Sequence, residues 1–143
     1  MKLLSGNFDL TIDDKNRLLI PAELRRAFDP LAEGEFTSFY LVFGANGRPW
    51  LWCSKTYEAK AEGQSLSLTP TQEQIDTIHR LYGDTAKVEL DRQGRVLVPE
   101  KVIKDFELPR EVTLVGACDH LELWDRPSYL EYRRKLRGRQ AAA

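Results

Sequence analysis

Cysteine, histidine and methionine are scarce in this sequence, which has two Cys, two His and one Met in 143 residues. Cys53 and Cys118 do not form a C-x-x-C pair, which argues against a disulfide scaffold, a redox motif or a zinc ribbon. A chain of this length buries about 68–70% of its unfolded surface and folds without such cross-links. We expect one compact domain, or two small halves that share a core, with both thiols free and buried.

Long hydrophobic runs are also missing. The sequence contains no stretch of about 18 apolar residues, and residues 1–6 lack the apolar run of a signal peptide. We therefore expect a cytoplasmic protein with no membrane partner. The net charge of -1 excludes a uniformly basic nucleic-acid binder, so any basic surface must be local.

Motifs of common enzyme classes are absent as well. The sequence has no P-loop, no dinucleotide fingerprint, no serine-hydrolase elbow and no H-E-x-x-H motif. Cys118 and His120, even with Cys53 added, make a poor zinc set because tetrahedral sites need four ligands in closer sequence pairs. We predict no enzymatic activity, no catalytic residue, no metal and no cofactor, and we expect a buried Cys and a surface His near a hairpin.

An internal repeat is the strongest feature that is present. Residues 12–21 (I-D-D-K-N-R-L-L-I-P) return as residues 90–99 (L-D-R-Q-G-R-V-L-V-P). In both copies an Asp stands four residues before an Arg, and three aliphatic residues and a Pro follow. Each half has the pattern of a strand, a turn, a strand, a helix and a hairpin. The repeat predicts a mainly β protein with short helices, in the α+β class.

The centre of each repeat has the chemistry of a tight turn. Asn16 and Gly94 occupy equivalent places, and both residue types tolerate the positive φ that such turns require. We interpret D-x-x-x-R as a hairpin loop that Asp13, Asp91 and Gly94 shape. On one interpretation its role ends there, because the Asp pairs with the Arg or accepts backbone N–H bonds.

The other interpretation is that the two turns present side chains to DNA. Arg offers a planar fork to guanine or phosphate, Asn and Gln can pair with adenine, and Lys supplies a compact charge. The candidate DNA-contacting residues are Lys15, Asn16, Arg17, Arg92, Gln93 and Arg95. The presence of two such turns in one chain favours this function over the purely structural one.

Proline and apolar spacing place the elements that follow each turn. Short helices are predicted after Pro21 and Pro99, where apolar residues recur every three to four positions, as in Leu24 and Phe28. A hairpin is predicted in each half, the first around Asn46-Gly47. The predicted helices are 22–28 and 100–106, and the predicted strands are 40–43, 50–53, 113–116 and 121–124.

The segment between the halves is predicted to be helical. Residues 54–64 form one expected helix, and residues 69–82 form another, with a capping box that opens at Thr69 and a stop at Gly83. A last helix is expected over 129–136, followed by a basic tail that frays. The predicted divisions are a first repeat at 1–54, a helical connector at 55–83, a second repeat at 84–127 and a C-terminal helix and tail at 128–143.

The doubled D-x-x-x-R motif, together with the W-L-W and L-E-L-W strand segments, resembles the MraZ family of bacterial transcriptional regulators. Each member contains two SpoVT-AbrB-like halves, and the likeness covers nearly the full length. It implies that both halves of one chain form a pseudo-twofold, swapped-hairpin barrel, and that chains assemble into a ring-shaped homo-oligomer. It also implies a nucleoid-associated regulator, acting as a repressor, that binds double-stranded DNA at direct repeats upstream of the division and cell-wall gene cluster.

The family motif reads Asp-x-Lys-Gly-Arg, and the position of its Arg is occupied here by Arg17, the first candidate for DNA contact. Lys15 matches too, while Asn16 replaces the usual Gly and adds a side-chain donor and acceptor to the turn.

An alternative is a protein-interaction or assembly module that has the same fold but does not bind DNA. Aromatic residues crowd one region and could line a subunit interface or belong to the core. They are Phe36, Phe39, Tyr40, Trp50 and Trp52. RNA binding is a third possibility, but the sequence contains no RNP-type or KH-type motif.

Overall fold

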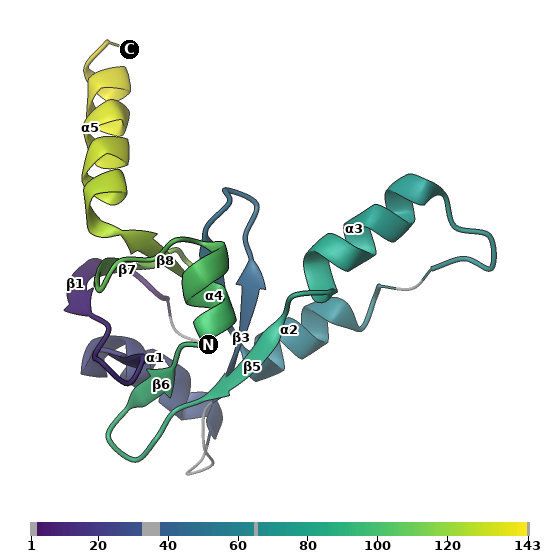
Figure 1. Ribbon diagram of the computed structural model, residues 1–143, viewed down its shortest axis with the longest axis horizontal. Coiled ribbons are helices and arrows are strands. Elements are labelled where there is room, and N and C mark those ends of the chain that lie inside the picture. The colour runs from purple at the N-terminus through teal and green to yellow at the C-terminus, as the bar shows by residue number, and fades with distance from the viewer. Residues whose placement is uncertain (1–2, 33–37, 65, 143) are drawn as a thin grey trace.

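The computed structural model describes residues 3–32, 38–64 and 66–142, without the side chains of residues 28–32 and 142 (Figure 1). Pairs of strands alternate with helices along the chain, as the repeat predicts. The elements are β1 (Asn7–Thr11), β2 (Arg17–Leu19), α1 (Ala22–Ala32), β3 (Ser38–Phe43), β4 (Pro49–Cys53), α2 (Ser54–Ala61), α3 (Gln72–Tyr82), β5 (Ala86–Glu89), β6 (Arg95–Leu97), α4 (Glu100–Asp105), β7 (Glu111–Gly116), β8 (Leu121–Asp125) and α5 (Arg126–Ala142).

The strands of the two halves are interleaved. Six strands form one antiparallel sheet in the order β1-β7-β8-β4-β3-β5, and β2 and β6 form a separate antiparallel ladder. The first strand of each half therefore pairs with the hairpin of the other half, β1 with β7 and β5 with β3. The predicted α+β fold of two tandem repeats is confirmed.

The strand registers show that the two halves are related by a pseudo-twofold axis. Leu18 pairs with Val96 in the β2-β6 ladder, and each of them directly follows the Arg of its repeat. Trp50 pairs with Glu122 where β4 meets β8, and each stands two residues before the equivalent Trp of its own hairpin, Trp52 or Trp124. Because each residue in these pairs is the counterpart of the other, both pairs lie on the axis.

One hydrophobic core serves both halves. The residues before and after each turn enter it, including Ile12, Leu18 and Ile20 from the first half. Val96 and Val98 enter it from the second half, together with aliphatic residues of β7 and β8. Burial of this continuous apolar set fixes the β2-β6 ladder against the large sheet, which holds the two turns in place.

The helices differ from the sequence prediction in their ends. The capping box of α3 is made by Thr71 and Gln74 rather than by Thr69, so the helix starts at Gln72, while Gly83 caps its other end as expected. Helix α2 ends at Ala61. Thr71 closes a box of the same spacing two residues further on, and a single sequence does not distinguish the two registers.

The C-terminal helix is longer than predicted. Helix α5 runs from Arg126 to Ala142 instead of ending at Leu136, and Figure 1 shows it projecting from the sheet. Most of its residues beyond Leu136 are good helix formers, Arg, Gln and Ala, so the helix continues through Gly138 where fraying was expected. Within residues 3–32, 38–64 and 66–142, no helix is long and apolar enough to cross a membrane.

The prediction of two buried thiols and a surface His was wrong at two positions. Cys53 is buried, but Cys118 is exposed, in a turn where its φ is 73°. His120 is only 8% exposed, because its ring stacks on Trp50 at 3.8 Å between centroids. Its two ring nitrogens lie 2.9 Å from carboxylate oxygens of Asp119 and Glu122, which satisfies both of them inside the protein.

Candidate nucleic-acid interface

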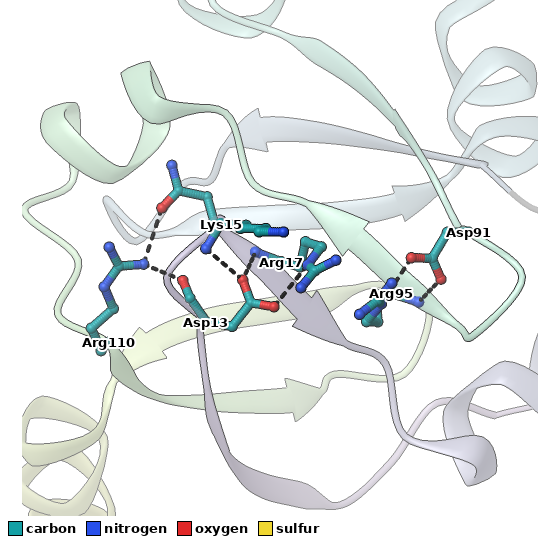
Figure 2. Close-up of polar contacts among 7 residues, drawn as sticks. Asp13, Lys15, Arg17, Asp91, Arg95 and Arg110 are labelled. Atoms are coloured by element: carbon teal, nitrogen blue, oxygen red, sulfur yellow. Dashed lines mark hydrogen bonds and ion pairs between the residues drawn. The ribbon is translucent and has the colours of Figure 1, made fainter.

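The first D-x-x-x-R turn is organised by one carboxylate. The Asp13 carbonyl accepts the Asn16 N–H at 3.0 Å, and the Asp13 N–H donates to the Arg17 carbonyl at 3.0 Å. The Oδ1 atom of Asp13 accepts the N–H groups of Lys15 at 2.9 Å and Arg17 at 2.8 Å. Its Oδ2 atom accepts from Nε of Arg17 at 2.8 Å (Figure 2). The carboxylate thus fixes both the backbone of the turn and the Arg side chain.

The second turn repeats these bonds. Oδ1 of Asp91 accepts the N–H groups of Gln93 and Arg95, each at 2.9 Å, and Oδ2 accepts from Nε of Arg95 at 2.8 Å. The backbone bonds also recur, with the Gly94 N–H on the Asp91 carbonyl at 3.0 Å. The interpretation of Asp13 and Asp91 as loop-shaping residues therefore has a direct geometric basis in both halves.

These contacts also set the charge of the turns. Hydrogen bonds from the Arg17 and Lys15 N–H groups and from the Arg17 side chain hold the pKa of Asp13 below its usual value. The Arg95 and Gln93 donors lower the pKa of Asp91 in the same way. Both aspartates are therefore ionised at neutral pH, and each neutralises part of the charge of its own arginine.

The residues with positive φ attach each turn to the opposite half. Asn16 has φ 63° and Gly94 has φ 82°, as the sequence predicts. The Asn16 carbonyl accepts the Val98 N–H at 2.7 Å, and the Gly94 carbonyl accepts the Ile20 N–H at 2.9 Å. The hairpin-loop prediction thus holds for the tight turn but not for its arms, because β1 and β2 pair with β7 and β6 rather than with each other.

The β2-β6 ladder carries the two arginines on one face. Arg17 pairs with Leu97 and Arg95 pairs with Leu19, whereas the central Leu18 and Val96 point into the core. Because side chains alternate along a strand, Arg17, Leu19, Arg95 and Leu97 share the outer face. Figure 2 shows the Arg17 and Arg95 side chains between the two turns. We call this surface, with its four side chains, the ladder face.

Two further arginines, which no sequence pattern indicates, lie beside the turns. Nη1 of Arg110 donates to the Asp13 carbonyl and, at 3.0 Å, to Oδ1 of Asn16 (Figure 2). Arg25 lies over the other turn, where a Cβ atom on Gly94 would stand 2.7 Å from its guanidinium, and its Nε donates to the Ile20 carbonyl at 2.9 Å. No local motif marks either residue, because each reaches a turn of the opposite half.

The structure places the other candidates around the ladder face. Lys15, Arg92 and Gln93 are exposed at the tips of the turns, while the amide oxygen of Asn16 is occupied by Arg110. The acidic side chains Glu58, Glu73 and Asp76 belong to α2 and α3, which lie on the other side of the molecule from β6 in Figure 1. Lys55 and Lys60 of α2 and Arg80 of α3 accompany these acidic side chains, so the two helices are mixed in charge.

The aromatic region proposed for protein contacts has a mixed character. Phe39 belongs to the core, whereas Trp50 and Trp52 line a hollow of about 280 Å³ between the β3-β4 turn and helices α2 and α3. Tyr40 lies outside it, donating from its hydroxyl to Glu58 at 2.7 Å. Phe36 and the side chain of Phe28 lie outside the described residues.

Comparison with known proteins gives the family of this doubled, interleaved fold. The model of the family described as "MraZ protein, putative antitoxin-like" matches residues 3–77 and 81–142. The chain belongs to the MraZ family.

Curated MraZ relatives match along nearly all of the chain. The proteins of Mycoplasmoides gallisepticum and Moorella thermoacetica are 32% and 31% identical to it. The alignments cover 89% and 93% of this chain and 84% and 88% of the relatives. The protein of Mycoplasmopsis pulmonis is 29% identical over 88% of this chain and 81% of its own. All three are named "Transcriptional regulator MraZ".

Proposed function

We propose that this protein is a sequence-specific DNA-binding transcriptional regulator that acts on the division and cell-wall gene cluster, as a repressor. It reads direct repeats with its two D-x-x-x-R turns. The observation that carries the proposal is the ladder face, where two identically bonded turns present Arg17 and Arg95 together. A two-stranded β-ribbon is one of the two elements that fit the major groove of B-DNA.

The chemistry of the ladder face supports this role. Each Arg binds its Asp through Nε, and within the described residues its two terminal nitrogens make no hydrogen bond. A guanidinium held in this way still offers a planar donor pair for guanine or for phosphate, with less entropy to lose on binding. Lys15 and Arg92, exposed at the turn tips, would contact phosphates on either side.

Assembly into a ring-shaped homo-oligomer is the second part of the proposal. A single copy presents few basic side chains, but linked copies on successive repeats make the later contacts intramolecular. Helix α3 supports self-association. Its apolar stripe consists of Ile75, Ile78, Leu81 and Tyr82, and none of these residues is buried within the described part of the chain. Such an amphipathic helix is stable only when another surface covers its apolar side.

The proposal is tested by fluorescence anisotropy with a duplex that carries the direct repeats upstream of this protein's own operon. Arg17→Ala and Arg95→Ala should each weaken binding by about 1–3 kcal/mol, since each removes one bidentate contact. The backbone bonds to Asp13 and Asp91 remain in these variants, so the turns keep their shape.

Arg80→Ala is the matched control, because Arg80 is an exposed arginine on α3, away from the ladder face. It should bind as the wild type does, and raising the salt concentration should weaken all complexes. Equal affinity of the wild type for the repeats and for a scrambled duplex would refute the proposed function and favour the assembly module.

A further inference from the structure

Two exposed leucines stand between the arginines of the ladder face, and the proposed arginine contacts leave them without a role. Leu19 is 47% exposed and Leu97 is 59% exposed. The residues on both sides of each leucine in the sequence, such as Leu18 and Ile20, are almost fully buried. The alternation of the strand therefore places each leucine outward, and nothing in the described chain covers it.

The two leucines are arranged by the pseudo-twofold axis. Leu97 lies directly across the ladder from Arg17, and Leu19 lies directly across from Arg95. Cross-strand neighbours have Cβ atoms about 4.5–5.5 Å apart, so each leucine adjoins an arginine of the other half. The face thus offers two arginines and two apolar side chains in one compact, repeated pattern.

The surroundings of the leucines indicate what could cover them. Arg17 and Arg95 flank them, and Lys15, Arg92 and Arg110 lie exposed at the rim. A partner for this surface must carry dense negative charge outside and a small apolar group inside. The major groove meets both demands, because phosphates line its edges and the 5-methyl group of thymine projects into it.

We propose that Leu19 and Leu97 are specificity residues that contact thymine methyl groups in the major groove. Arg17 and Arg95 then bind guanine or phosphate beside them. This inference rests on the proposed function and deepens it, since it assigns a base type to two side chains that the D-x-x-x-R motif does not include. It predicts that thymines adjoin the arginine contacts within each repeat.

Deoxyuridine in place of thymine removes only the methyl group, so it tests the contact directly. In anisotropy titrations, each thymine of the repeat duplex is replaced by deoxyuridine in turn, for the wild type, Leu19→Ala and Leu97→Ala. The wild type should lose about fourfold in affinity at the contacted thymines, as expected for one buried methyl group. Each Leu variant should lose affinity for the unmodified duplex and show no further loss at its own thymine.

Leu130→Ala is the control, because Leu130 is an exposed leucine on α5, and it should respond to deoxyuridine as the wild type does. Unchanged affinity and unchanged deoxyuridine sensitivity in Leu19→Ala and Leu97→Ala would overturn the inference. A smaller assembly of these variants in light scattering would also overturn it, by identifying the face as a subunit interface. If the wild type does not prefer the repeats to a scrambled duplex, the proposed function itself fails.

Discussion

At the scale of single residues, Asp13 and Asp91 connect the shape of the turns to their chemistry. Each carboxylate binds two backbone N–H groups and one guanidinium Nε. The aspartates therefore do not compete with the function proposed for the arginines, because they hold them in a defined position. The structural and the DNA-binding interpretations of D-x-x-x-R are compatible in this geometry.

Asp13→Asn should weaken binding to the repeat duplex by about two- to tenfold, the cost of ordering one released arginine on binding. An amide has one oxygen, so it cannot serve the backbone N–H groups and Nε of Arg17 together. Anisotropy measures the loss. Asp14→Asn, an exposed change of the same kind one residue further on, should bind as the wild type does, and an equal loss in both variants would contradict this role.

Sequence patterns gave the conformation of the turns but not all of their partners. Positive φ at Asn16 and Gly94 follows from residue type and place in the repeat. Arg25 and Arg110 were missed because their contacts cross between halves that are far apart in the sequence. His120 was misplaced at the surface because a lone His carries no signal of the carboxylates that will surround it.

At the scale of elements, the β4-β8 pairing is a short seam with a polar centre. The ladder pairs Trp50 with Glu122 and Leu51 with Leu121. Burial lowers the pKa of His120, but hydrogen bonds to Glu122 and Asp119 raise it by more, so it lies above the usual value. The same contacts leave the pKa values of Glu122 and Asp119 below their usual range.

The seam should make stability depend on pH. The pKa of His120 is raised in the folded protein. The contribution of His120 to the stability of the fold is therefore fully present below the unfolded pKa of about 6.5, and it is lost as pH rises through the folded pKa. The thermal midpoint of the wild type should therefore fall across that interval, and His120→Gln should flatten the fall. The lowered pKa values of Glu122 and Asp119 act in the opposite direction. The stability that these carboxylates contribute is lost in acid, as pH falls through their folded pKa values.

His79→Gln is the control, since His79 is exposed on α3. It should keep the pH profile of the wild type in calorimetry. Parallel profiles for the wild type and His120→Gln would show that the protonation of His120 is not coupled to folding and would contradict this prediction.

The sequence predicted the order of elements better than it predicted their partners. Strand and helix patterns repeat in both halves, so the succession of elements could be read directly from the duplication. The pairing of β1 with β7 and of β5 with β3 is long-range, and only the family resemblance implied such a swap. Helix ends shifted because two capping registers, at Thr69 and Thr71, fit the same stretch.

At the scale of the whole molecule, the surface proposed for DNA binding is separate from the surface proposed for assembly. The ladder face is basic, whereas α3 is acidic in its first turn and apolar along one side. Figure 1 shows α3 extending from the sheet on the side away from β6. This separation would allow neighbouring copies to associate through α3 while each ladder face remains open.

Ile78→Glu should therefore reduce the mass of the assembly, because it places a charge in the apolar stripe of α3. Binding to a duplex with several repeats should fall by about 100-fold or more as avidity is lost, while binding to a single repeat stays unchanged. Light scattering and anisotropy measure the two effects. Arg80→Glu puts the same carboxylate on the exposed side of the helix and should change neither, and an intact assembly in Ile78→Glu would contradict the role of α3.

The most direct test of the account is a crystal structure of the protein bound to a duplex that carries the direct repeats. The account predicts the β2-β6 ladder in the major groove, with the guanidinium groups of Arg17 and Arg95 on guanine edges or phosphates. A complex in which the ladder face points away from the DNA, with contacts made by the basic end of α5 instead, would contradict it.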